Sequence, residues 1–285
     1  MTAANAPFPV HLIRGAIEAA LAEDLGLPGD ITTNATIPAE ASLSAVIAAR
    51  KAGRVAGLPL AEAAFRHLDP AVAFRTVTGD GEDVGPSGAV AEVRGNARAL
   101  LSAERVALNF LGHLSGIATH TSAFAEAIAG TNARICCTRK TTPGLRAFEK
   151  YAVRMGGGVS HRFGLFDAIL IKDNHVAAAG GIGAAIGLAK RAAGHLVKIE
   201  VEVDSLAQLE EALRFPIDVA LLDNMSAADM RQAVAMAKGR AVLEASGGVT
   251  LANVREIAAT GVDLISVGAL THSSPVLDLG LDFVC

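Results

Sequence analysis

The second half of the chain repeats one pattern of apolar and polar positions. Short apolar runs rich in Val, Ile and Leu, each followed by a polar residue, alternate with Ala-rich segments of helical spacing. Strands that alternate with helices in this way form right-handed crossovers and therefore a parallel sheet. The predicted strands lie within six runs, residues 133–138, 166–174, 196–204, 217–225, 241–248 and 262–270.

The polar residues that end these runs recur at a nearly constant interval. They are Lys172, Glu202, Asp223, Ser246 and Gly268, separated by 30, 21, 23 and 22 positions. One strand and one helix in each such interval is typical of an α/β barrel, in which functional side chains gather at the carboxyl ends of the strands. Because six runs fall short of the eight strands of a closed barrel, we expect an open, incomplete α/β barrel.

The first part of the chain has a different pattern. A helix is predicted over residues 10–24, and a second one over 58–68. Strands are predicted at 41–50, 71–79 and 88–95. This α+β order indicates a separate, smaller domain.

A long helical stretch over about residues 97–129 bridges the two parts without a low-complexity linker. We place the N-terminal domain at residues 1–115 and the barrel domain, which carries the active site, at residues 116–285.

The composition, with 51% hydrophobic and 19% charged residues, is typical of a globular protein with a well-buried core. No run approaches the roughly 18 apolar residues that a membrane span requires, and the first residues lack a cationic region followed by an apolar core. Cys136 and Cys137 are adjacent and Cys285 is the third cysteine, an odd number without metal-site spacing. We therefore expect a cytoplasmic protein with reduced, buried thiols in its strand.

Cationic residues are concentrated in one segment. The chain has a net charge of −4, yet residues 134–175 contain eight Lys or Arg against three acidic residues. Such a concentration predicts an anion-binding site. Arg139 and Lys140 follow one predicted strand and Lys172 ends another, so we expect them at the barrel mouth. A nucleic-acid-binding module is disfavoured because it requires a basic domain with many interleaved aromatic residues.

Acidic residues and glycines end the later strands. Glu200 and Glu202 share one face of a strand by period-two alternation, and Asp223 ends the next strand. Acidic residues from neighbouring strands can hold Mg²⁺ or accept hydrogen bonds from sugar hydroxyls. Glycine turns at residues 246–248 and at Gly268 are typical of phosphate binding by backbone amides. The pattern predicts a site for a phosphorylated, metal-chelated anion and a second anionic reactant.

Longer motifs resemble the quinolinate phosphoribosyltransferase family. TRKTTPGLR at residues 138–146, followed by EKYAVRMGGGVSHRFGLFDAILIKDNH, carries the resemblance, which extends over nearly the whole chain. Further matching stretches are EDLGLPGDITT, RKAGRVAGL, ARALLSAERVALNFLGHLSGIAT, IEVEVDSLAQLEEAL, LLDNM, EASGGV and SVGALTHS. The resemblance implies an N-terminal α/β sandwich domain, an open α/β barrel, and a homodimer in which each N-terminal domain covers its partner's barrel mouth.

The implied activity is that of a pentosyltransferase in NAD biosynthesis. It joins quinolinate to phosphoribosyl pyrophosphate and releases pyrophosphate and CO₂ to give nicotinate mononucleotide, with Mg²⁺ and without an organic cofactor. Arg139, Arg162 and Arg105 of the partner subunit would hold the quinolinate carboxylates, helped by Thr138 and His161.

The remaining implied roles concern the second substrate. Lys140 and Lys172 would face the reacting centre and the phosphates, while Glu202 and Asp223 would take the ribose hydroxyls and Mg²⁺, directly or indirectly. Glu202 is chosen over Glu200 because its 21-residue step to Asp223 fits the family spacing. The residues that would cradle the 5′-phosphate are Ser246, Gly247, Gly248, Val267, Gly268 and Ala269, with His272 nearby.

Two positions depart from the usual family pattern, since members often carry Asp where this chain has Cys137 and Asn where it has Ser160. Both replacements are small and leave the named cations intact. The alternative is a paralogous barrel of the molybdenum-transport-associated type that acts on another anion.

Overall fold

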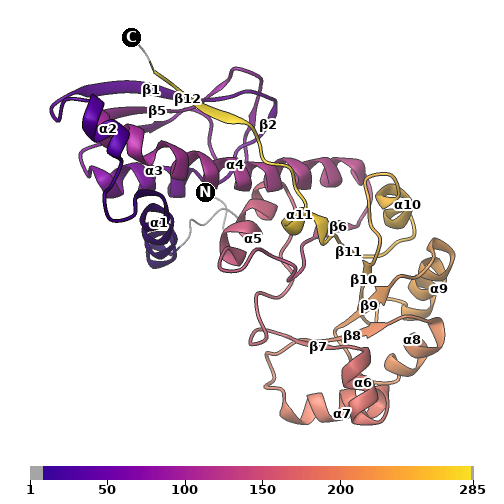
Figure 1. The fold of residues 1–285 in the computed structure, drawn as a ribbon. Helices are drawn as coiled ribbons and strands as arrows, with labels where there is room; N and C mark the ends of the chain where they lie inside the picture. The colour runs from indigo at the N-terminus through magenta and orange to yellow at the C-terminus, as the bar shows by residue number, and fades with distance from the viewer. Residues whose placement is uncertain (1–8, 284–285) are drawn as a thin grey trace. The chain divides into compact units, whose positions relative to one another are not determined.

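The computed structural model describes residues 9–283 as an α/β protein (Figure 1). Its residues form two compact units. The first contains the chain up to Ser122, Thr142–Gly157 and the segment from Ser273 onward; the second contains Ala123–Thr141 and Gly158–His272. The two units are therefore not continuous in sequence, because two later segments of the chain belong to the first unit. Cys285 lies outside the described residues.

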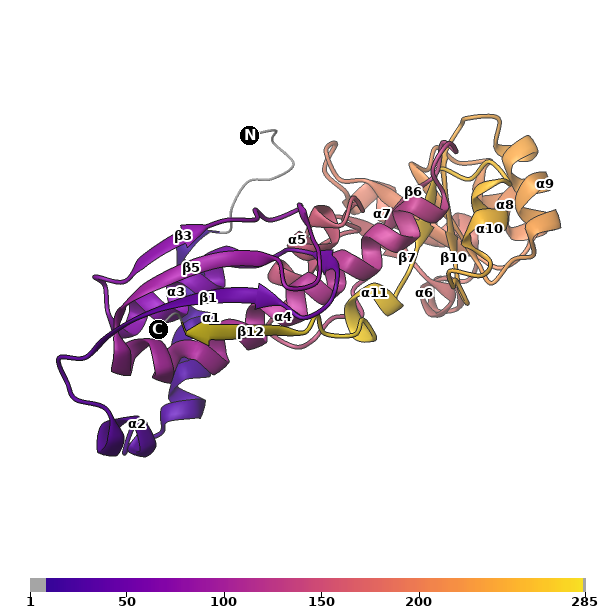
Figure 2. The same cartoon turned by 90° about the horizontal axis from the view of Figure 1, so that it is seen from above.

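The first unit is built on a four-stranded antiparallel sheet (Figure 2). Its order is β12 (Leu279–Phe283), β1 (Ser42–Ala49), β5 (Ala89–Asn96) and β3 (Ala73–Thr76). Three of these strands were predicted, and β12 was not. β12 pairs with β1 at the edge of the sheet, with Leu281 opposite Ile47. A two-stranded ribbon of β2 (Gly53–Arg54) and β4 (Asp83–Val84) completes the strands of this unit.

Helices cover one face of the antiparallel sheet (Figure 1). They are α1 (Val10–Leu25), α3 (Leu58–Leu68) and the first part of α4 (Ala97–Ala127), with α2 (Ile31–Thr36) and α5 (Arg146–Met155) in the same unit. α3 coincides with its predicted range. Its Leu60 and Phe65 are fully buried, each contributing roughly 1.5–3 kcal/mol. The fold of this unit is therefore the expected α/β sandwich.

The second unit contains a six-stranded parallel sheet. Its order is β6 (Arg134–Cys136), β11 (Leu264–Ser266), β10 (Val242–Ser246), β9 (Val219–Asp223), β8 (Ile199–Val203) and β7 (Ile169–Ile171). Every strand falls within a predicted run. The helices of this unit that follow the strands in the chain are α6 (Asp173–Ala179), α7 (Ile182–Ala192), α8 (Leu206–Ala212), α9 (Ala227–Ala237), α10 (Val254–Ala258) and the short α11 (Ala269–His272).

The parallel sheet curves into an open barrel. Val159 forms a parallel bridge with Cys136, and its N–H donates to the carbonyl of Ile135 at 2.8 Å. This segment extends the sheet beyond β6 and carries the following residues to the carboxyl ends of the strands. Within residues 9–283, β6 and β7 do not pair with each other, so the predicted open barrel is confirmed.

Alternation along β8 explains why the barrel interior is polar near its mouth. Ile199, Val201 and Val203 are buried on one face, toward the covering helices. Glu200 and Glu202 alternate onto the other face, inside the barrel, where Glu202 lines the cavity described below. Among the described residues, no helix is long and apolar enough to cross a membrane.

Candidate active site

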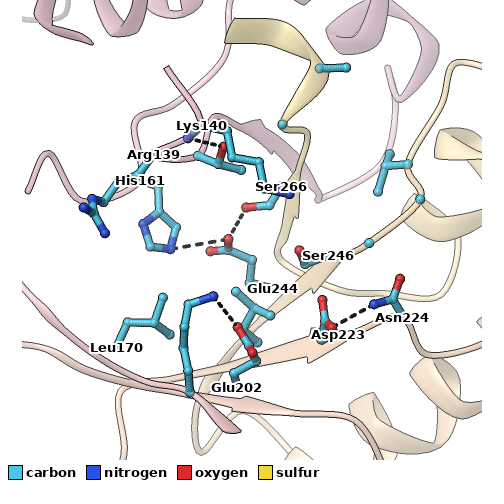
Figure 3. A pocket seen from close by; sticks show the side chains of 18 of the residues that line it. Arg139, Lys140, His161, Leu170, Glu202, Asp223, Asn224, Glu244, Ser246 and Ser266 are labelled. Carbon is cyan, nitrogen blue, oxygen red and sulfur yellow. Dashed lines mark hydrogen bonds and ion pairs between the residues drawn. The ribbon is translucent and has the colours of Figure 1, made fainter. Parts of the chain in front are cut away.

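The carboxyl ends of the barrel strands surround a cavity of about 780 Å³ (Figure 3). All residues that line it belong to the second unit. Cationic side chains line one part of the wall, and acidic side chains and glycine turns line another. The predicted site residues that line this cavity are Thr138, Arg139, Lys140, His161, Arg162, Lys172, Glu202, Asp223, Ser246, Gly247, Gly248, Gly268, Ala269 and His272.

Two predicted site residues do not line the cavity. Arg105 lies on α4 within the first unit and is exposed. Val267 is 1% exposed, and its N–H donates to the carbonyl of Cys136 at 2.9 Å. The Val267 amide is therefore engaged within the sheet and is not available to a phosphate.

Sequence reasoning missed six of the lining residues. These are Leu170, Leu221, Asn224, Glu244, Val249 and Ser266. Four of them precede a predicted strand-end residue by two positions, as Glu244 precedes Ser246. Period-two alternation places such pairs on one face, so that spacing was the signal that could have found them.

The cationic wall contains two arginines with unused donors. The Nε atoms of Arg139 and Arg162 are buried and have no hydrogen-bond partner among the described residues. Burial lowers the pKa of Arg162, and the charge of Arg139 lowers it further. Two neighbouring, half-buried guanidinium groups are stabilised by an anion that both can bind. This wall is therefore suited to a carboxylate.

Carboxylates from two adjacent strands form the acidic part of the wall. Glu202 Oε2 lies 3.0 Å from Lys172 Nζ, and Asp223 Oδ2 accepts a hydrogen bond from Asn224 Nδ2 at 2.7 Å. The Lys172 side chain is 48% exposed, so this ion pair contributes little to stability and can exchange for ligand contacts. Two hard carboxylate groups fit Mg²⁺, which usually takes one or two protein carboxylates and completes its shell with phosphates and water.

The turn after β10 needs glycine for steric reasons. Gly247 has φ +93° and Gly248 has φ +59°. A Cβ at Gly247 would collide with the Asn224 side chain and lie 3.0 Å from the Asn224 main-chain N, whereas a Cβ at Gly248 would meet nothing within 4 Å. The main chain at Gly247 thus lies close to Asn224. Such a turn leaves backbone amides available to a phosphate.

The two departures from the family pattern lie at the edge of the site. Cys137 is fully buried in the sheet extension, and the Ser160 Oγ atom is buried without a hydrogen-bond partner among residues 9–283. Neither displaces a cationic side chain from the cavity lining.

Comparisons with known proteins agree with this geometry. Residues 30–115 match the quinolinate phosphoribosyl transferase N-terminal domain, and residues 117–282 match the C-terminal domain. The chain belongs to the quinolinate phosphoribosyltransferase family. The resemblance inferred from the motifs is therefore confirmed.

Relatives of the family cover nearly the whole chain. A probable nicotinate-nucleotide pyrophosphorylase [carboxylating] from Bacillus subtilis is 45% identical over 91% of this chain and 89% of its own length. The Mycobacterium leprae nicotinate-nucleotide pyrophosphorylase [carboxylating] is 46% identical, over 94% and 96% respectively. The crystal structure of NadC from Streptococcus pyogenes superimposes with a TM-score of 0.94 at 41% identity, covering 98% of this chain and 100% of that one. These names do not favour the molybdenum-transport-associated alternative.

Proposed function

We propose that the chain is a decarboxylating quinolinate phosphoribosyltransferase of NAD biosynthesis. It transfers the phosphoribosyl group of phosphoribosyl pyrophosphate to quinolinate and produces nicotinate mononucleotide, CO₂ and pyrophosphate. The observation that carries the proposal is the pair of buried Nε donors of Arg139 and Arg162, which have no hydrogen-bond partner within residues 9–283, in one cavity with Glu202, Asp223 and a glycine turn.

Quinolinate carries two carboxylates, and the cationic wall provides their counter-charges. The guanidinium groups of Arg139 and Arg162 offer planar pairs of donors that match a carboxylate, which a lysine does not. A bound carboxylate would satisfy the buried Nε atoms and offset the repulsion between the two cations. Thr138 lines the same wall.

Phosphoribosyl pyrophosphate would occupy the opposite part of the cavity. Glu202 and Asp223 would accept hydrogen bonds from the ribose hydroxyls, and the amides at Gly247, Gly248 and Gly268 would bind the 5′-phosphate. Mg²⁺, when bound, would offset the charge of the pyrophosphate, and Glu202 and Asp223 are the residues that would hold it.

The proposed reaction uses these groups in sequence. The quinolinate nitrogen attacks C1 of the ribose, the bond from C1 to the pyrophosphate oxygen breaks, and Lys140 and Lys172 stabilise the departing charge. The ring nitrogen then carries a positive charge. The adjacent carboxylate leaves as CO₂, its electron pair remains beside that charge, and the carbon takes a proton. Because the ring itself stabilises these electrons, the reaction requires no organic cofactor.

A direct assay tests this function. The protein is incubated with quinolinate, phosphoribosyl pyrophosphate and Mg²⁺, and nicotinate mononucleotide, pyrophosphate and CO₂ are quantified. Equal amounts of the three products are expected. Turnover of nicotinate in place of quinolinate, or no nucleotide product with quinolinate, would refute the proposal.

The enzyme is proposed to act in the cytoplasm as a homodimer whose sites are completed in trans by Arg105 of the partner subunit. The support is that Arg105 is an exposed cation on α4 that does not line the cavity of its own second unit. The Arg105→Ala and Lys140→Ala homodimers should both be inactive. Randomly assembled mixtures should regain about a quarter of wild-type activity, because half of the dimers then contain one intact site. No recovery in mixtures would place Arg105 outside the partner's site.

A further inference from the structure

A second polar layer lies beneath the residues at the cavity mouth. Glu200, Glu244 and Ser266 each precede a strand-end site residue by two positions and face the same barrel interior, one step deeper. They are 6%, 2% and 4% exposed. Two carboxylates at this depth need close hydrogen-bond partners, because a charge removed from water is strongly destabilising unless it is paired.

His161 contacts both carboxylates. Its Nε2 lies 3.0 Å from Glu200 Oε2 and 3.6 Å from Glu244 Oε1. Ser266 Oγ donates a hydrogen bond to the same Glu244 oxygen, and Figure 3 shows His161, Glu244 and Ser266 side by side in the cavity. The polar layer is thus one connected network with the imidazole at its upper edge.

The second ring nitrogen of His161 fixes its tautomer. The main-chain N–H of Arg162 donates to His161 Nδ1 at 2.8 Å. A ring nitrogen that accepts an N–H carries no proton, so the proton of the neutral imidazole is on Nε2. From there it is donated to Glu200.

The hydrogen bond from the Arg162 N–H to His161 Nδ1 also argues against a metal ion in the polar layer. One ligand atom each from His161, Glu200 and Glu244 lie within 4.8 Å of one another, a spacing that suits a cation. Metal binding at Nε2 requires its lone pair and would move the ring proton to Nδ1. That proton would then face the N–H of Arg162, so the geometry favours a hydrogen-bonded imidazole.

The imidazole holds Arg162 at its main chain, and other contacts hold the far end of its side chain. Arg162 Nη1 donates to the carbonyl of Ala168 at 3.0 Å, whereas Nε has no partner in the described part of the chain. Burial and the charge of Arg139 lower the pKa of Arg162, and Glu200 opposes both effects. Glu200 therefore acts on Arg162 through His161 and through its own charge.

We propose that Glu200 is a positioning residue for quinolinate binding. It holds His161 in the Nε2–H tautomer, and His161 in turn fixes Arg162 so that its guanidinium meets a substrate carboxylate. Glu244 lies near the same Nε2 atom and accepts a hydrogen bond from Ser266. The identity of the substrate rests on the proposed function, but the tautomer and the contacts of His161 do not.

The tautomer is measured without any substrate. Proton–nitrogen correlation spectra of the enzyme labelled with ¹⁵N-histidine report the protonation of each ring nitrogen, and a His161→Gln variant identifies the His161 signals by their absence. We expect a neutral ring with its proton on Nε2 in the free wild-type enzyme. A proton on Nδ1, or on both nitrogens, at neutral pH would overturn the proposal.

Kinetics of two Glu200 variants test the positioning role. Glu200→Met replaces the acceptor with an apolar side chain of similar length, which buried sites often tolerate. It should lower kcat/KM for quinolinate by about 100-fold, because a displacement of about 1 Å at a binding group has that effect. KM for phosphoribosyl pyrophosphate should change little. Glu200→Gln, whose amide oxygen can still accept the Nε2 proton, should recover most of the activity.

The outcomes separate the positioning role from general support of the fold. A thermal melt first establishes that each variant is folded. Equal losses toward both substrates, or wild-type kcat/KM for quinolinate in folded Glu200→Met, would overturn the proposal. Absence of quinolinate turnover in the wild-type enzyme would refute the proposed function instead, while the spectrum of His161 would still test the network.

Discussion

Replacing Arg139 by alanine tests the central feature of the site. The Arg139 Nε is buried without a partner among the described residues, so its removal breaks no side-chain hydrogen bond from that atom. Surface and near-surface substitutions of this kind usually change stability by less than about 1 kcal/mol. We therefore expect Arg139→Ala to fold with a thermal midpoint close to that of the wild type.

The expected loss of activity is much larger. A guanidinium that binds a carboxylate in bidentate fashion makes two charge-assisted hydrogen bonds, each worth about 1.5–3 kcal/mol. Losing both removes about 3–6 kcal/mol of transition-state binding, and each 1.36 kcal/mol corresponds to a tenfold change in rate. The kcat/KM for quinolinate should therefore fall by about two to four orders of magnitude. Arg139→Lys keeps the charge without the planar fork, so its loss should be smaller but still clear.

The assay follows nicotinate mononucleotide while quinolinate is varied at saturating phosphoribosyl pyrophosphate. Arg134→Ala is the matched control, since Arg134 is an exposed cation on β6, the strand that precedes Arg139, and does not line the cavity. Its kcat/KM should be that of the wild type. Wild-type kcat/KM in folded Arg139→Ala, or equal activity of the Arg139→Lys variant and the wild type, would refute the carboxylate-binding role.

Three further predictions concern the turn, the core and pH. Gly247→Ala should raise KM for phosphoribosyl pyrophosphate far more than Gly248→Ala, because only the former adds a collision with a neighbour; equal effects would exclude the close approach. Glu149→Ala should lower the free energy of unfolding by about 2–4 kcal/mol in denaturant titrations, since its fully buried carboxylate accepts from the Thr142 N–H and contacts His113 Nε2 at 2.9 Å; an unchanged midpoint would contradict this. Burial lowers the pKa of His120 below its ordinary value of 6.5, so the unfolded chain binds more protons and stability falls as pH drops below that value. His120→Gln should flatten this acid-side slope, and an unchanged slope would place its origin elsewhere.

The barrel strands were predictable because most of their residues are apolar and buried or half-buried. Such strands appear as short apolar runs, and their recurrence with the helices between them identifies the fold. The short α2 was not predicted, since its Thr- and Asn-rich sequence has weak helix propensity. Asp30 starts that helix by accepting a hydrogen bond from the Thr33 N–H at 2.9 Å, and it also accepts one from Ser102 Oγ at 3.0 Å. The second contact comes from a distant segment and is not readable locally.

β12 shows a different limit. Its sequence mixes Leu with Gly and Asp, and among the described strands it pairs with β1 alone. Arg50, which directly follows β1, forms an ion pair with Asp282, more than 200 positions away in the sequence. Pairing at that separation depends on how the whole unit packs, and a local pattern cannot supply it.

Sequence periodicity does not determine how deep a site residue lies within the barrel. Alternation places Glu200 and Glu202 on one face, but two residues along a strand correspond to about 6.6 Å, enough to separate the mouth from the floor. Glu202 meets Lys172 at the mouth, whereas Glu200 is buried against His161. The partner of the deeper carboxylate comes from the segment after Val159, which lies outside the repeating strand–helix pattern. In the proposed function the two acidic residues have different tasks: Glu202 faces the ligand, and Glu200 faces His161, which positions Arg162. The pairing of the Val159 segment with β6, which the sequence pattern does not show, distinguishes Glu200 from Glu202.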